Sequence, residues 1–86
     1  MDKVRAQVVD VIGADMVEDI GGAYVADVGP FYVVVLPSGD GTVEVFATSD
    51  ATGPVGRWEP EDGSYAVCDV DGVAEAVSLT LGWVGF

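Results

Sequence analysis

Six consecutive apolar residues, Phe31 to Leu36, constrain the fold of this chain more than any other segment. Half of this run is valine, whose branched side chain favours extended backbone. An unbroken apolar run of this length is typical of a strand that is buried on both faces, as strands in the middle of a sheet are. The sequence therefore predicts a sheet in which this strand is central.

The segments around the run predict three further strands. Residues 37–41 have turn composition, so residues 31–36 and 42–48 are expected to form a hairpin. Residues 49–63 are dense in Ser, Asp, Gly and Pro and predict the longest loop, after which residues 64–70 alternate as a strand. A short strand is also expected over residues 23–28. Alternation in the hairpin's second strand puts Val43, Val45 and Ala47 on one side, and Thr42, Glu44, Phe46 and Thr48 on the other.

An N-terminal helix is predicted over residues 2–12, with Asp2 as its N-cap. After Gly13 a kink, or a new short helical turn, is expected over residues 15–20, ended by Gly21 and Gly22. The apolar face of the first helix consists of Val4, Val8, Val11 and Ile12, and the turn is expected to direct Met16, Val17 and Ile20 inward.

A closing helix is predicted over residues 72–81, with Asp71 as its N-cap. Its apolar face holds Val73, Ala76, Val77 and Leu81, and an apolar tail of Trp83, Val84 and Phe86 follows. This tail is expected to cap the core, or alternatively to form a self-association patch that makes a homo-oligomer. The predicted fold is α+β: one domain over residues 1–86, with a small antiparallel sheet of three to four strands and both helices on one face.

Charge is the feature that bears most on function. The chain has 15 Asp and Glu, three Lys and Arg and no His, a formal net charge of −12. Because half of its residues are apolar, we expect a folded acidic domain and not a disordered tail. Such a surface is repelled by phosphate and anionic lipid, which argues against direct binding to nucleic acid or membranes. The single cysteine, Cys68, and the lack of an apolar leader or span favour a cytoplasmic protein.

Enzymatic chemistry has little support in this sequence. Without histidine, Ser-His and Cys-His nucleophile pairs are excluded. Cys68 lies in a predicted strand, which favours a small buried hydrophobe over a reactive thiol. Asp69 to Gly72 superficially resembles a calcium loop, but Val67 and Ser78 would occupy positions that need carboxylates. We therefore expect no catalytic, cofactor or metal site.

Charge mimicry of nucleic acid is the leading functional hypothesis. Proteins that grip nucleic acid carry Lys and Arg grooves, and a compact acidic domain can occupy and block such a groove. Small acidic phage proteins that block host defence nucleases, including some anti-CRISPR proteins, are similar in size, charge and lack of catalytic residues. An aromatic anchor beside loop acids would suit such an interface, although Trp58 could equally be a core residue. The candidate partner-binding residues are Asp10, Asp15, Glu18, Asp19, Trp58, Glu59, Glu61, Asp62, Asp69, Asp71 and Glu75.

Two other functions stay open. Proteins of extreme halophiles are acidic throughout, favour Asp and avoid Lys, and this chain has ten Asp and one Lys. At molar salt the Debye length is about 3 Å, so self-repulsion is screened and the acidity needs no partner. The chain would then be a small structural or regulatory domain. The second alternative is a small carboxylate-based enzyme or ligand-binding subunit.

Overall fold

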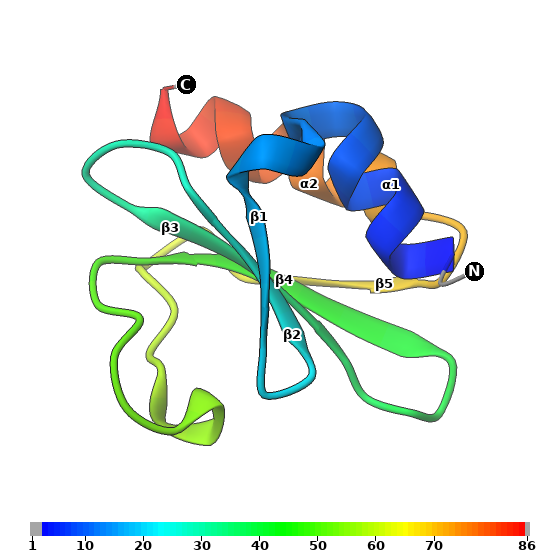
Figure 1. Ribbon diagram of the computed structural model, residues 1–86, viewed down its shortest axis with the longest axis horizontal. Coiled ribbons are helices and arrows are strands. Elements are labelled where there is room, and N and C mark those ends of the chain that lie inside the picture. Colours follow the sequence, from blue (N-terminus) through cyan, green and yellow to red (C-terminus); the bar gives the residue numbers. More distant parts are fainter. Residues whose placement is uncertain (1–2, 86) are drawn as a thin grey trace.

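The structure, a computed structural model, describes residues 3–85 and consists of a five-stranded antiparallel sheet with two helices. Both helices lie on one face of the sheet (Figure 1). The predicted α+β class and helix placement are confirmed, but the sheet has five strands and not three or four. The elements are α1 Lys3–Ile12, β1 Val17–Ile20, β2 Ala23–Asp27, β3 Tyr32–Pro37, β4 Thr42–Thr48, β5 Ala66–Asp69 and α2 Val73–Val84, with 3₁₀ turns at Ala14–Met16 and Val55–Arg57.

The additional strand is β1, where a helical turn was predicted. Gly21 and Gly22 have φ of 59° and 87°, the backbone that a two-residue hairpin turn requires, and they pair β1 with β2. Val17 and Ile20 therefore point to opposite faces of the sheet, not to one helical face. Met16, which was expected to point inward, is 36% exposed.

The meander order β1-β2-β3-β4-β5 confirms that β3 is the central strand. Side chains from alternating positions of β2, β3 and β4 pack against both helices and form the main core. Its buried residues include Val4 and Val8 of α1, Val35, Val43 and Val45 of the sheet, and Val73 and Val77 of α2. The predicted inner faces of the helices and of β4 are thus confirmed.

Helix α2 is longer than predicted and begins differently. It runs to Val84, so Trp83 belongs to the helix and not to a tail. Its N-cap residue is Gly72, with no side-chain cap, so the predicted Asp71 cap is wrong. The carboxylate of Asp69 accepts hydrogen bonds from the amides of Asp71 and Gly72 instead, at 3.0 and 2.9 Å. The predicted Asp2 cap and Phe86 lie outside the described residues.

Gln7 of α1 takes over part of the cap's role. Its Oε1 accepts a hydrogen bond from the Ala74 amide at 3.1 Å, within the first turn of α2. Its Nε2 donates to the Val70 carbonyl at 2.6 Å. One side chain therefore joins α1, the first turn of α2 and the segment that connects β5 to α2.

A third layer covers the sheet face opposite the helices. The loop of residues 49–63, which we call the covering loop, lies on this face (Figure 1). Its Trp58, Val55 and Ala51 pack in a second core. Because both faces of β3 are covered, the unbroken apolar run of that strand has a direct structural explanation. Within residues 3–85, no helix is long and apolar enough to cross a membrane.

Candidate functional site

The pleat of the sheet directs strand acids to the face that the covering loop shares. Tyr24 and Ala26 contact the helix-side cores, so their neighbours on β2, including Asp27, point the other way. The register carries this orientation to Glu18 on β1 and Glu44 on β4. Asp69, the last residue of β5, has its carboxylate turned to the amides at the start of α2. Asp19 alternates with Glu18 and lies on the helix side. One face of the sheet therefore carries an acid from three of its five strands.

The covering loop is held at its centre by Trp58. This side chain is 7% exposed, and its Nε1 donates a hydrogen bond to the Thr52 carbonyl at 2.9 Å. Of the two interpretations left open by the sequence, the core role is the one the structure shows. Trp58 is therefore not an exposed anchor for a partner, and it fixes the position of the acids around it.

The end of the covering loop is tied to β4 beyond the last β4–β5 pair. The Glu61 amide donates to the Ala47 carbonyl at 2.7 Å. The buried Ser64 hydroxyl accepts from the Ala47 amide at 3.1 Å and lies 2.7 Å from the Glu61 carbonyl, to which it donates. These bonds replace strand pairing at Ala47, so the acids at the end of the loop are held on an ordered backbone.

Acids of the covering loop surround a hollow of about 240 Å³. Asp50, Glu59 and Glu61 line it together with Arg57, its one basic lining residue. Asp50 accepts hydrogen bonds from the Thr52 hydroxyl at 2.6 Å and the Thr52 amide at 3.0 Å. These two bonds hold the pKa of Asp50 below its ordinary value, and the bond from the hydroxyl has the larger effect. Asp50 therefore keeps its negative charge into acidic solution.

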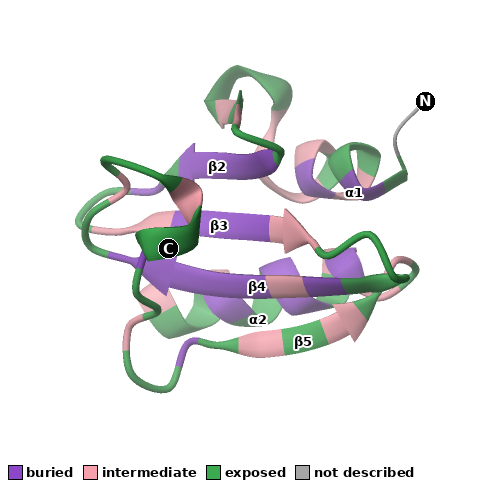
Figure 2. Cartoon of the chain, turned by 90° about the horizontal axis from the view of Figure 1, so that it is seen from below, coloured by how far each residue is buried: buried purple, intermediate pink, exposed green. Residues whose placement is uncertain are grey.

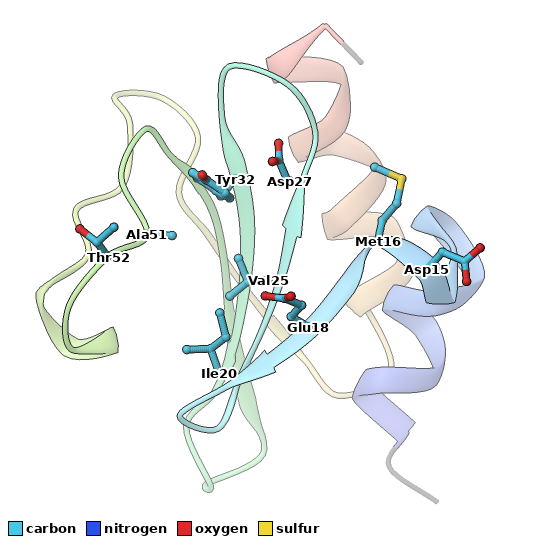
Figure 3. A pocket seen from close by; sticks show the side chains of 9 residues that line it. All are labelled: Asp15, Met16, Glu18, Ile20, Val25, Asp27, Tyr32, Ala51 and Thr52. Carbon is cyan, nitrogen blue, oxygen red and sulfur yellow. The ribbon is translucent and has the colours of Figure 1, made fainter.

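A larger hollow of about 490 Å³, whose lining residues Figure 3 shows, shares Thr52 with the first, so the two adjoin. In Figure 3, Glu18 lies beside Val25 and Ile20, across from Ala51 and Thr52 of the covering loop. No lysine or arginine lines this hollow, whereas three acidic residues do. An apolar floor beneath carboxylates suits a lysine or arginine side chain, whose stem is apolar and whose head is cationic. The acidic lining residues are Asp15, Glu18 and Asp27, and Figure 3 shows the carboxylate of Asp15 pointing away from the other two.

Two of the three basic residues lie away from these hollows, and the third, Arg57, lines the smaller one. Lys3 and Arg5 lie on α1, across the sheet from the covering loop, and Lys3 forms an ion pair with Asp71. The surface formed by the second sheet face and the covering loop therefore concentrates negative charge. We call it the acidic face, and it comprises Asp15, Glu18, Asp27, Glu44, Asp50, Glu59, Glu61 and Asp62.

The structure brings together only part of the partner-binding set predicted from the sequence. Asp15, Glu18, Glu59, Glu61 and Asp62 belong to the acidic face, whereas the carboxylate of Asp69 is bonded to amides at the start of α2. Asp10 lies on α1, Asp19 on the helix side of β1, Asp71 in the ion pair with Lys3, and Glu75 on α2. The predicted set is thus divided between two sides of the molecule.

Sequence reasoning missed Asp27, Asp50 and Glu44. Asp27 and Asp50 stand singly in the chain, and only the strand register and the position of the covering loop place them beside other acids. Alternation in the sequence had already placed Glu44 on the other side of its strand from Val43 and Val45. The sequence did not show, however, which of the two sides the helices cover. Glu44 also accepts a hydrogen bond from the Tyr65 hydroxyl at 2.6 Å, which raises the pKa of Tyr65.

Other reactive groups are few. Cys68 is half-buried, and burial, with the Asp69 charge as a smaller cause, raises the pKa of its thiol and makes the thiolate rare at neutral pH. Among residues 3–85, no three His, Cys, Asp or Glu side chains are arranged to hold a metal ion. Comparisons with family models, curated proteins and solved structures find no match to this chain.

Proposed function

We propose that this chain is a non-enzymatic interaction protein that binds and blocks a basic surface of another protein, one that handles nucleic acid. One observation carries the proposal: carboxylates from three strands and the covering loop share one face, while Lys3 and Arg5, two of the three basic residues, lie across the sheet. A basic groove built for a row of phosphates would meet a comparable array of negative charge here.

The hollows add shape to the charge. An arginine or lysine of the partner could lay its stem on Ile20 and Val25 and reach Glu18 and Asp27 with its cationic head. Such contacts would be specific in geometry as well as in sign. Direct binding to nucleic acid is disfavoured by the same charges, which repel phosphate.

Order in the covering loop favours binding for an entropic reason. Trp58 and the bonds to Ala47 hold the loop acids before a partner arrives, so less conformational entropy is lost on association. The acidic face is thus a prepared surface and not a flexible tail that must order itself.

The test is displacement of a fluorescent DNA duplex from a linker histone, a lysine-rich DNA-binding probe, at low and high salt. We expect the chain to release the duplex with an affinity that falls as salt increases. The double variant Glu59→Lys with Asp62→Lys should weaken displacement of the duplex by about tenfold. Screened surface contacts contribute up to ~1 kcal/mol each, and charge reversal makes them repulsive.

A matched control separates position from total charge. Asp10→Lys with Asp19→Lys changes the net charge equally but lies outside the acidic face. We expect this pair to weaken displacement by less than threefold. Equal losses for the two pairs would reject the face as the binding site. Unfolding of the unmodified chain at low salt would favour the salt-adapted domain instead.

A further inference from the structure

Strand β5 is an edge of the sheet with outward-facing backbone groups. Among the described residues it pairs with β4 alone. Ala47 of β4 directs its amide and carbonyl toward the β5 side, where Ser64 and Glu61 bind them. Alternation along the ladder then turns the backbone groups of Ala66 and Cys68 toward β4. Val67, between them, presents its N–H and C=O to the free edge.

An apolar groove of about 370 Å³ runs beside this edge, between β5 and α2. Leu79 of α2 is 68% exposed and Val67 of β5 is 56% exposed, the two most exposed large apolar residues among those described. Figure 2 shows the contrast: β2, β3 and β4 are largely buried, whereas β5 alternates between intermediate and exposed residues. An added strand along β5 would cover apolar side chains as well as satisfy backbone groups.

The opposite edge of the sheet is protected. β1 carries two exposed acids at its centre, Glu18 and Asp19, and charged edge residues are a common defence against unwanted strand pairing. On β5, the segment from Ala66 to Cys68 has no charge and no proline. The β1 edge is therefore protected against strand addition by charge, whereas the β5 edge lacks this protection.

We propose that the β5 edge and the flank of α2 receive an extended segment of another protein as a sixth strand, one in which apolar and basic residues alternate. Asp69 and Glu75 line the groove, and no lysine or arginine does. A second copy of this chain would bring the same acids and a further net charge of −12, so a basic segment is the better electrostatic match. This surface goes beyond the proposed function and does not depend on it.

Strand alternation predicts which residues of the bound segment would face each side of the sheet. Its residues on the helix side would pack beside Ala76 and Leu79. Those on the other side would lie beside Val67 and Asp69, where a lysine or arginine would find a carboxylate. Backbone hydrogen bonds to Val67 would fix the register.

The test uses an amidated, acetylated ten-residue peptide of alternating valine and lysine, followed by calorimetry and amide NMR. A control peptide of the same sequence, methylated on every internal backbone nitrogen, has the same charge but cannot add as a strand. We expect the first peptide to bind at least tenfold more tightly and to shift the amides of residues 66–69 and Leu79. Equal binding of the two peptides, or shifts confined to the covering loop, would overturn the proposal.

Variants of this chain locate the contact. Val67→Pro removes the outward N–H and should weaken binding of the peptide at least tenfold. The chain should still fold, because proline is tolerated on edge strands. Asp19→Pro is the matched control on the other edge. Ile20 pairs with Ala23 across the two-residue turn, so the backbone groups of Ile20 face β2. The N–H of Asp19, one residue earlier, therefore faces the free edge of β1. Circular dichroism checks that both fold.

A second pair of variants covers the case in which Val67→Pro does not fold. Leu79→Lys should weaken the peptide at least fivefold, and Ser78→Lys, with the same charge change one residue away on α2, by less than twofold. Equal effects would overturn the proposal. So would a stable dimer of the free chain that Val67→Pro or Leu79→Lys dissociates, since the edge would then serve a second copy. Neither variant touches Glu59 or Asp62, so failure here leaves the test of the acidic face intact.

Discussion

Replacing Trp58 by alanine should remove a large part of the stability of this domain. A buried tryptophan takes about 150–250 Å² from water, or roughly 4–6 kcal/mol as an upper bound at ~25 cal/mol per Å². Measured Trp→Ala losses in cores are about 3–5 kcal/mol. The hydrogen bond from Nε1 to the Thr52 carbonyl is lost as well. Since a domain of this size has roughly 4–13 kcal/mol in total, we expect a loss of about 3–5 kcal/mol.

Urea unfolding followed by far-ultraviolet circular dichroism measures this loss. With a slope of roughly 1 kcal/mol per molar urea for a small domain, the midpoint should fall by about 3–5 M. Trp83→Ala is the matched control: that side chain is 39% exposed and stacks edge-on against Phe31, with ring centroids 5.2 Å apart, so about 1–2 kcal/mol is expected. A Trp58→Ala loss below ~1 kcal/mol, or below that of Trp83→Ala, would refute the role of the covering loop as a packed layer.

Three further predictions concern single contacts. Gln7→Ala removes the hydrogen bond to the Ala74 amide and should cost about 1–2 kcal/mol in urea unfolding; an unchanged midpoint would contradict the bridging role. Gly21→Ala places a Cβ at φ 59°, 3.0 Å from a side chain of the covering loop, and should cost about 1–3 kcal/mol by the same measurement, whereas a neutral result would contradict the hairpin. Thr52→Ala should raise the pKa of Asp50 toward its ordinary value in a carboxyl NMR titration, and no change would mean that Thr52 does not bind this carboxylate. Because the folded pKa of Asp50 is the lower one, its charge stabilises the folded state at neutral pH, and that contribution disappears as the pH falls through the folded pKa.

Periodicity in the sequence predicted the elements that have one dominant pattern. The apolar run of β3, the alternation of β4 and the inner face of α1 each fit a single kind of structure. The segment of β1 does not, because Val17 and Ile20 are three residues apart, a spacing that suits one face of a helix or opposite faces of a strand. Pairing with β2 through Gly21 and Gly22 decided between them, and that pairing is a tertiary event.

The candidate site was less predictable than the fold. The covering loop has no periodicity, and the burial of Trp58 depends on the sheet face opposite it. Glu18 and Asp19 are adjacent in the sequence but point to opposite faces once β1 is a strand. Runs of acids along the chain are therefore a poor guide to clusters of acids on the surface. Register and loop placement, which no local pattern specifies, determine which acids meet.

Amide NMR on the ¹⁵N-labelled chain, titrated with the linker histone, tests the central claim most directly because it maps the contact face without any substitution. The account predicts that shifts concentrate on the acidic face: Glu18, Asp27 and residues 50–62. It also predicts that they diminish as salt rises. Shifts centred on α1 and α2, or the same small shifts across both sides of the sheet, would contradict it.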